Sequence, residues 1–384
     1  MNLYILIFIF FIFNNLNQSE DFKIKRKVLW EQGVGKYNNY RIPSIITTKN
    51  GTLLAFCEGR ESGDSGNIDI LMKRSVDNGK TWSKEQIVWS DGVNTCGNPT
   101  PVQDEESGRI WLFSTWNLGE YDENEIINKT GNSKRAPYLT YSDDDGLTWS
   151  IPKNISNSSQ KPEWGWYATG PGVGIQIKNG KNKGRLIIPA NHSYDDPNGI
   201  IGNGPFNYGA HILFSDDNGE SWNISDQIKP GCNESQVVEL ENETLMINMR
   251  SYNNKHSRAF SLSFDGGLSW SKIKHDPQLV ESKCQASIIN YGYYNNKNIF
   301  LFSNPAVPFG RSNMTIKVSY DNCKTWSYSK VIHSGPSAYS CLTRLNNGNI
   351  GLFYEAGDKN NYEKMIFISI PAQALFLDKK INFY

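Results

Sequence analysis

The sequence predicts an all-β fold, a six-bladed β-propeller with four antiparallel strands per blade, over residues 22–384. The first supporting observation is a repeated octapeptide with the pattern S-x-D-x-G-x-[ST]-W. Its copies begin at Ser75, Ser142, Ser215, Ser263 and Ser319. The second observation is that a set of short apolar segments precedes each copy, and a sixth set follows the last one. The third is that the sequence contains no long amphipathic helical pattern.

The octapeptide is typical of a tight turn followed by a buried aromatic ring. Adjacent Asp, Asn and Gly tolerate positive φ and hydrogen-bond to their own backbone, and the final Trp suits the start of a strand. Only Cys323 departs from the pattern, at the Gly position of the fifth copy. Successive copies lie roughly 50 to 70 residues apart, which is the period expected for propeller blades. We therefore interpret the repeat as part of the scaffold.

The first set of strands is expected at residues 40–46, 53–58 and 68–74, with a further strand after the first octapeptide. Asn50-Gly51 favours a hairpin turn between the first two strands. A separate strand near Val28–Trp30 precedes the set and is expected to complete the last blade. The later sets are expected at 101–102, 109–114 and 136–141; 172–177, 185–189 and 210–214; 236–239, 244–249 and 258–262; 286–289, 298–302 and 314–318; and 340–345, 349–354 and 365–369.

Charge and targeting signals narrow the class of protein. Lys plus Arg and Asp plus Glu are equal at 39 each, which gives no electrostatic case for a nucleic-acid or acidic-membrane partner. The apolar run at residues 3–13 is too short to span a bilayer and predicts a signal peptide over residues 1–19. An uncleaved anchor is the alternative. No later stretch could span a membrane, so we expect a secreted or cell-surface protein.

Cysteines and sequons agree with secretion. The six cysteines allow up to three disulfides, and Cys323 is the first candidate for one. Their spacing does not suggest a zinc site, so we expect no metal and no other cofactor. N-x-[ST] sequons, which chance also produces in an Asn-rich chain, predict a glycoprotein. They include Asn128, Asn154, Asn157, Asn191, Asn223, Asn233, Asn242 and Asn313.

Candidate functional residues lie outside the octapeptides. Arg41, Arg250 and Arg311 each stand at or near the edge of an expected strand, in different blades. A single arginine of this kind is usually a surface charge, but three that converge would form a clamp for a carboxylate. Whether they converge does not follow from the sequence.

Three further residues could carry acid–base or nucleophilic chemistry. Tyr339 has small neighbours in the segment GPSAYSC, although a buried core tyrosine is the ordinary alternative. Glu234 stands directly before an apolar strand, unlike most surface glutamates. Asp64 lies in a glycine-containing loop of the first blade, where it could move.

The order of these residues resembles the exo-sialidase (neuraminidase) family with Asp-box (BNR) repeats, found in bacteria, trypanosomatids and animals. The Arg-Ile-Pro at residues 41–43, ahead of the first repeat, is the most specific element. The others follow in the family's order. They are Arg60, Asp64-Ser65-Gly66, Glu234-Ser235-Gln236, Arg250-Ser251, Gly310-Arg311, Ala338-Tyr339-Ser340 and Tyr354-Glu355.

The resemblance implies a role for each residue. Arg41, Arg250 and Arg311 would hold the sialic acid carboxylate, with Glu355 orienting Arg41. Tyr339 would be the nucleophile, Glu234 its base and Asp64 the acid/base. Arg60 would line the pocket near the sugar's 4-hydroxyl. Asn98, where many bacterial members have Asp, would contact the sugar. Trp116, Trp164 and Trp166 are candidates for the N-acetyl pocket, although tryptophans of a propeller are more often core residues.

The implied function is an exo-α-sialidase that releases terminal sialic acids from glycoproteins, glycolipids such as gangliosides, or oligosaccharides, with retention. Sialic acid carries a carboxylate on the reacting carbon, so a neutral tyrosine avoids the repulsion that a carboxylate nucleophile would meet. A trans-sialidase is the nearest alternative. Those enzymes usually carry a C-terminal lectin-like domain, and the sequence ends at Tyr384, so hydrolysis is expected. A non-catalytic sialic-acid-binding propeller would need the arginines but not the acid/base set.

Overall fold

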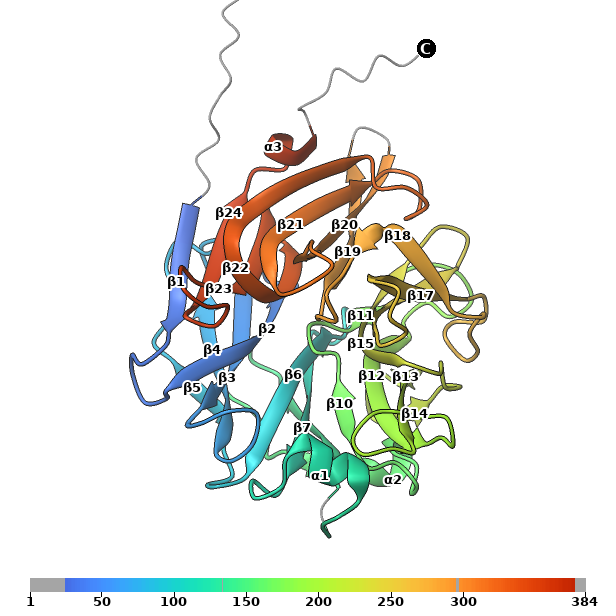
Figure 1. Ribbon diagram of the computed structural model, residues 1–384. Coiled ribbons are helices and arrows are strands. Elements are labelled where there is room, and N and C mark those ends of the chain that lie inside the picture. The colour runs from blue at the N-terminus through green and yellow to red at the C-terminus, as the bar shows by residue number, and fades with distance from the viewer. Residues whose placement is uncertain (1–24, 133, 295–296, 377–384) are drawn as a thin grey trace, which may run out of the picture.

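The computed structural model describes residues 25–132, 134–294 and 297–376, and the expected signal peptide at 1–19 lies outside them. The fold is all-β, with strands arranged around a common centre and only three short helices among the described residues (Figure 1). These helices are α1 (Glu123–Asn128), α2 (Ser156–Ser159) and α3 (Gln373–Phe376). None of the helices in the described ranges is long and apolar enough to cross a membrane.

The strands form antiparallel sets that follow the chain. The first two sets are β2 (Asn39–Thr47), β3 (Leu53–Arg60), β4 (Ile68–Ser75) and β5 (Gln86–Trp89), then β6 (Thr95–Gln103), β7 (Ile110–Asn117), β8 (Ala136–Ser142) and β9 (Lys153–Asn154). The third set is β10 (Tyr167–Thr169), β11 (Ile175–Gln176), β12 (Leu186–Asp195), β13 (Phe206–Ser215) and β14 (Asn223–Ile224). A single parallel pairing, between Ile68 and Thr95, joins the first two sets.

The second half of the chain repeats this arrangement. The fourth set is β15 (Cys232–Glu239), β16 (Leu245–Ser251), β17 (Ser257–Ser263) and β18 (Lys274–Val280). The fifth is β19 (Ser287–Tyr294), β20 (Lys297–Pro305), β21 (Ser312–Ser319) and the first half of β22 (Tyr328–Arg344). The sixth is the second half of β22 with β23 (Ile350–Ala356), β24 (Lys364–Ile370) and β1 (Lys25–Glu31). The expected pairing of the N-terminal strand with the last set is confirmed.

One strand was placed wrongly from the sequence. The first strand of the third set was expected at 172–177, but the structure has β10 before this segment and only the two-residue β11 within it. Pro171 has no N–H to donate to a ladder, and Gly172 adopts a φ of 131°, so the chain leaves the sheet between these two strands.

Apolar side chains fill each space between neighbouring sets. The core between the first two sets contains Leu54 and Leu112, and the core between the second and third contains Phe113 and Ile188. Similar clusters join the third to the fourth, the fourth to the fifth and the fifth to the sixth set. Another cluster, which includes Phe367, joins the sixth set back to the first. Every set therefore packs against its two neighbours.

The octapeptide repeat forms a capped turn between the third and fourth strands of a set. In the first copy, the Asp77 carboxylate accepts from the Thr81 backbone N–H at 2.9 Å and from its hydroxyl at 2.6 Å. The Trp does not begin a strand as expected, since Trp82 lies ahead of β5. Its ring packs against Phe367 of the sixth set with centroids 5.2 Å apart.

We expect Asp77→Ala to lower the free energy of unfolding by about 1 kcal/mol, as the loss of a helix N-cap does. Burial alone would raise the pKa of Asp77, but hydrogen bonds from Thr81 and Ser75 lower it to about 2. The carboxylate therefore stabilises the fold above the usual Asp pKa, and this contribution is lost as the pH falls towards 2. Urea unfolding of wild type, Asp77→Ala and Asp77→Asn checks this. The Asn variant keeps one acceptor and should lose less, and equal midpoints for all three proteins would contradict the assignment.

The expectation of up to three disulfides is wrong for this structure. All six cysteines are free thiols, and Cys323, the first candidate, is partly buried rather than bonded. Cys96, Cys232 and Cys284 belong to three different apolar clusters, so their side chains serve as core residues. At Cys323 the backbone has a φ of 60°, the left-handed conformation that the glycines of the other copies adopt more easily.

Candidate active site

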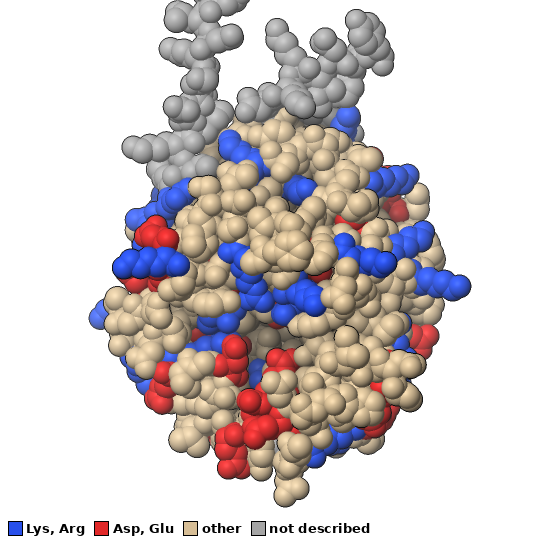
Figure 2. All heavy atoms as spheres, in the orientation of Figure 1, with Lys and Arg blue, Asp and Glu red and all other residues tan. Residues whose placement is uncertain are grey.

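A cavity of about 370 Å³ opens at one end of the innermost strands, and every sequence-predicted catalytic or sugar-contacting residue lines it. Those residues are Arg41, Arg60, Asp64, Asn98, Glu234, Arg250, Arg311 and Tyr339. They come from the first, second, fourth, fifth and sixth strand sets, so only the assembled fold brings them together. Figure 2 shows this hollow near the middle of one face, with basic atoms gathered on one side of it and acidic atoms on the other.

Three arginines surround the Tyr339 side chain. The Arg250 Nη1 donates to the Tyr339 hydroxyl at 3.0 Å. The guanidinium carbons of Arg41 and Arg311 lie 5.2 and 5.5 Å from the centre of the Tyr339 ring. The convergence that the sequence alone could not establish is therefore present. Three guanidinium groups beside one phenol can donate hydrogen bonds to a small anion bound there.

Glu355 is buried behind this cluster and holds two of its members. It is fully buried, and its Oε1 accepts from the Arg41 Nε and from the Ile42 backbone N–H, each at 2.8 Å. Its Oε2 accepts from the Tyr339 backbone N–H at 3.0 Å. Burial alone would lower the pKa of Arg41, but Glu355 and two tyrosines raise it above its usual value. Glu355 thus fixes the direction of Arg41, as expected, and also the strand that carries Tyr339.

Tyr339 and Glu234 meet through Arg250. The Arg250 Nη1 donates to the Glu234 carboxylate at 2.7 Å as well as to the Tyr339 hydroxyl. Because the phenol oxygen accepts from Arg250, its own hydrogen is available to a neighbouring base such as Glu234. Burial and then the Glu234 charge raise the pKa of Tyr339 well above its usual value, although Arg250 and Arg311 oppose this. Tyr339 is therefore a neutral phenol in the unliganded site.

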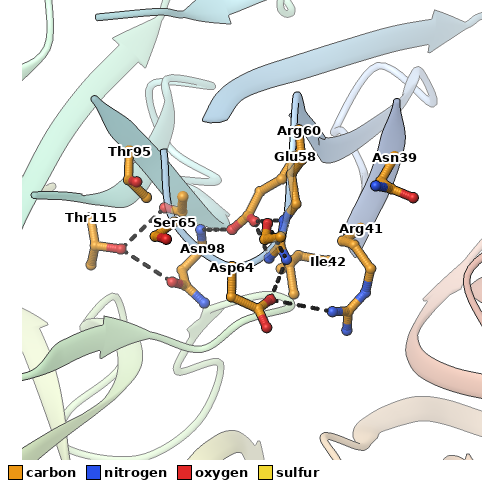
Figure 3. Close-up of polar contacts among 12 residues, drawn as sticks. Asn39, Arg41, Ile42, Glu58, Arg60, Asp64, Ser65, Thr95, Asn98 and Thr115 are labelled. Carbon is orange, nitrogen blue, oxygen red and sulfur yellow. Dashed lines mark hydrogen bonds and ion pairs between the residues drawn. The ribbon is translucent and has the colours of Figure 1, made fainter. Parts of the chain in front are cut away.

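Asp64 projects from the loop between β3 and β4 and is largely exposed, with 81% of its side chain accessible. It forms an ion pair with Arg60 and lies 3.6 Å from the Arg41 Nη1 (Figure 3). Partial burial would raise its pKa, but Arg60 and Arg41 outweigh this and lower the pKa of Asp64. In the unliganded site Asp64 is thus an ionised group lying against two cations.

Arg60 and Asn98 belong to a second polar group on the wall of the cavity. The Arg60 Nε donates to Glu58 at 2.8 Å, and the Asn98 backbone N–H donates to the same carboxylate at 2.6 Å (Figure 3). The Asn98 amide oxygen accepts from Arg135 at 2.7 Å and from Thr115 at 3.2 Å. Its backbone is left-handed, with a φ of 55°, which Asn tolerates better than most residues. Asn98 therefore lines the cavity as expected, with its oxygen engaged by the protein.

Sequence reasoning missed several residues that line the cavity. These are Glu58, Glu123, Arg135, Tyr252 and Tyr362. Burial lowers the pKa of Arg135 to about 10, despite nearby carboxylates. Burial raises the pKa of Glu123, while a hydrogen bond from Tyr208 at 2.7 Å opposes the rise. Glu123 and Arg135 lie in the long connection around α1, where no repeat or motif marks them. Glu58 ends an expected strand and belongs to no motif, whereas its neighbour Arg60 is part of the motif order.

The three candidate tryptophans have different environments. Trp166 lines the cavity and stacks under Arg135, with 4.5 Å from the guanidinium carbon to the ring centre. Trp164 is fully buried and stacks on His192 with centroids 3.7 Å apart, so it is a core residue. Trp116 donates to Asp91 and does not line the cavity. Only Trp166 therefore remains a candidate for contact with a ligand.

A larger cavity, of about 800 Å³, lies at the other ends of the innermost strands. Ile45, Val173, Val237, Ile288 and Leu342 are among the residues that line it, and none of the predicted site residues does so. The two cavities are thus on opposite sides of the strand segments that carry Arg41, Glu234 and Tyr339. No group of three or more His, Cys, Asp or Glu side chains in the described ranges is arranged to hold a metal ion.

The family model described as a BNR repeat-like domain matches residues 51–352. The solved structure of Hadza microbial sialidase Hz136 is 32% identical, with a TM-score of 0.77 over 88% of this chain and 67% of that chain. The chain belongs to the family of sialidases with BNR repeats. Among curated sialidases, that of Bacteroides fragilis is 32% identical over 341 residues and that of Micromonospora viridifaciens is 33% identical over 344 residues.

These two alignments cover 83% and 85% of this family member. In the other direction, the chain spans 60% of the B. fragilis protein and 51% of the M. viridifaciens protein. The matched part includes the octapeptides, which lie at residues 75–326. The family resemblance expected from the motif order is confirmed.

Proposed function

We propose that this protein is an exo-α-sialidase, a glycoside hydrolase that releases terminal sialic acid with retention through a tyrosyl-enzyme intermediate. The observation that carries the proposal is the convergence of Arg41, Arg250 and Arg311 on Tyr339 in one cavity that also contains Glu234 and Asp64. A module that only binds sugar would need the arginines but would have no use for a neutral phenol, a neighbouring base and an acid/base carboxylate in the same cavity. The substrates would be sialylated glycoproteins, glycolipids or oligosaccharides.

The arginines would bind and orient the substrate carboxylate. Guanidinium groups donate in a planar fork that matches the two carboxylate oxygens. The carboxylate charge is present in both the bound substrate and the transition state, so the arginines contribute chiefly to binding and orientation. With Arg41 held by Glu355 and Arg250 by Glu234, these guanidinium groups are preorganised.

The first chemical step would form a bond from the Tyr339 oxygen to the anomeric carbon. Glu234 takes the phenol proton, Asp64 gives a proton to the glycosidic oxygen, and the bond from carbon to that oxygen breaks. In the second step Asp64 accepts a proton from water as the water oxygen attacks the anomeric carbon. The bond to Tyr339 then breaks, and Glu234 returns the proton to the phenolate. Two displacements at one carbon give net retention.

This mechanism predicts two different pH limits. Asp64 must be protonated for the first step, and its pKa is lowered in the free protein by Arg60 and Arg41. A substrate carboxylate on Arg41 would weaken that effect and raise the pKa of Asp64 in the complex. We therefore expect kcat for a poor leaving group to decline at a higher pH than kcat/KM does, because kcat/KM reports the free enzyme. Initial rates for sialyllactose from pH 3 to 8 test this. The prediction would be contradicted if kcat declined at a lower pH than kcat/KM does.

The fold and the location extend the same proposal. We infer a closed six-bladed propeller over residues 22–384, supported by the apolar core that joins the last strand set to the first and by the pairing of β1 with β24. Residues 1–19 would form a signal peptide, and the protein would be secreted or at the cell surface. The proposal calls for no metal or cofactor, because every step uses a side chain of the cavity.

The primary test is incubation of the purified protein with a fluorogenic sialoside. The expected result is release of the fluorophore and of free sialic acid. Adding lactose separates hydrolysis from transfer, since a trans-sialidase would give sialyllactose in place of free sialic acid. No release by the wild-type protein across the pH range, with sialic acid still bound, would instead support a non-catalytic binding module.

A further inference from the structure

The segment Gly170-Pro171-Gly172, here called the axial loop, lies between the two cavities. Ala168, just before it, lines the smaller cavity, and Val173, just after it, lines the larger one. All three residues of the loop are buried. The loop belongs to the third strand set. Its carbonyl groups accept hydrogen bonds from the strands that carry Glu234 and Arg41. They also accept one from Gln285, which is hydrogen-bonded to the strand that carries Tyr339. None of its residues belongs to the proposed chemistry.

The first connection runs to β15, the strand that carries Glu234. The Ser235 backbone N–H donates to the Gly170 carbonyl at 3.0 Å. The Gln236 side-chain amide donates to the Pro171 carbonyl at 3.2 Å and to the Val173 carbonyl at 3.3 Å. Ser235 and Gln236 directly follow Glu234, so the loop holds the part of β15 next to the Glu234 carboxylate.

The second connection runs through Gln285 to β22, the strand that carries Tyr339. The Gln285 amide nitrogen donates both to the Pro171 carbonyl at 3.2 Å and to the Ser340 carbonyl at 3.0 Å. The Ser340 backbone N–H donates to the Gln285 amide oxygen at 3.0 Å. The Gln285 side chain thus pairs with both the N–H and the C=O of Ser340, the residue directly after Tyr339, as a neighbouring β-strand would. Gln285 is 1% exposed, so water does not replace these bonds.

The third connection runs to β2, which carries Arg41. The Ser44 hydroxyl donates to the Gly172 carbonyl at 2.6 Å. A Cβ atom added at Gly172 would lie 2.3 Å from the Gln236 side-chain nitrogen, and the φ of 131° there also favours glycine. The axial loop therefore has no room for a side chain at the point where these connections meet.

We propose that the axial loop and Gln285 act as positioning elements that set Arg41, Glu234 and Tyr339 relative to one another. These three residues stand on different strand sets. Glu355 and Arg250 link them in pairs, and the axial loop with Gln285 adds hydrogen bonds to nearby residues on each of their strands. Displacement of a reacting group by about 1 Å can cost about 100-fold in rate. The inference rests on the proposed hydrolysis, since it concerns the geometry of that reaction.

The test compares Gln285→Met, which keeps side-chain length but removes all three hydrogen bonds, with the wild-type protein. We expect kcat for a fluorogenic sialoside to fall about 10- to 100-fold. The dissociation constant for free sialic acid should change less than about threefold, because the arginine side chains remain. The matched control is Gln176→Met, which removes hydrogen bonds to Asp104 and Gly184 and one from the Glu105 backbone N–H beside the larger cavity, and should leave kcat within about twofold.

Gln285→Glu provides a readout that a loss of stability alone would not give. A protonated Glu can donate one of the lost bonds, whereas an ionised Glu can donate none. The kcat of Gln285→Glu relative to wild type should therefore recover as the pH falls. If Gln285→Met does not fold, kcat is compared in Gln285→Glu and Ser44→Ala instead.

The inference is overturned if the folded Gln285 variants keep kcat within twofold of wild type, or if kcat of Gln285→Glu follows the wild-type pH profile. A wild-type protein that releases no sialic acid would overturn the proposed function first, and the inference with it. An active wild type with unaffected variants would overturn the inference alone.

Discussion

Replacing Tyr339 by Phe is expected to lower kcat for sialoside hydrolysis by a factor of roughly 10³ to 10⁶, the range seen when a catalytic nucleophile is removed. The variant loses one oxygen, the atom that would bond to the anomeric carbon. The ring, its packing near Arg41 and Arg311 and the backbone bond to Glu355 all remain. Binding of free sialic acid should therefore persist, and isothermal titration alongside the rate assay checks both expectations.

Tyr354→Phe is the matched control for this variant. Tyr354 is fully buried in β23, and its hydroxyl has no hydrogen-bond partner among the described residues. Removing that hydroxyl should leave kcat close to the wild-type value and should not destabilise the fold. If Tyr339→Phe retained more than about a tenth of the wild-type rate while Tyr354→Phe behaved as expected, Tyr339 would not be the nucleophile.

Asp64→Asn is expected to have the second largest effect, and its size should depend on the leaving group. General acid catalysis contributes about 10²- to 10⁴-fold. Release of an alkyl sugar such as lactose needs the proton from Asp64, so kcat/KM for sialyllactose should fall by about that factor. An aryl leaving group is stable as an anion and needs little protonation, so a nitrophenyl or methylumbelliferyl sialoside should lose much less rate in the first step.

Glu61→Gln serves as the control within the same loop. Glu61 is exposed, accepts from Asn67 at 2.8 Å and does not line the cavity. Glu61→Gln should change the rate for neither sialyllactose nor the aryl sialoside by more than about twofold, since exposed carboxylates away from a site contribute little. Equal losses for both leaving groups in Asp64→Asn would argue against a role as general acid and favour a purely electrostatic one.

Much of the fold could be predicted from the sequence because the signal repeats. The capped turn formed by Ser75, Asp77 and Thr81 is local chemistry, so each copy marks the end of a third strand wherever it occurs. The expected strand positions were set by their distance from these repeats. The expected pairing of the Val28–Trp30 strand with the last set is confirmed. The exception lies at Gly170–Gly172, where the chain leaves the sheet to make contacts with other strand sets. No local pattern encodes those contacts.

The candidate site was predictable where residues belong to motifs and unpredictable where they do not. Arg41, Asp64 and Tyr339 stand in recognisable segments, and the structure brings them into one cavity. Glu123 and Arg135 also line that cavity, but they lie in a connection without a repeat. Their burial and altered pKa values arise only when distant strands assemble around them. Gln285 is a similar case, because its function in positioning depends on a carbonyl group from another strand set.

The measurement that most directly tests the proposed mechanism is mass spectrometry of the protein after reaction with 2,3-difluorosialic acid. The fluorine at carbon 3 slows both displacement steps, and fluoride at carbon 2 leaves readily, so the first intermediate should accumulate. We expect a single 3-fluorosialyl adduct on the peptide that contains Tyr339, absent from Tyr339→Phe and discharged slowly as activity returns. A wild-type protein that hydrolyses sialosides but forms no adduct, or forms it on another residue, would contradict the account.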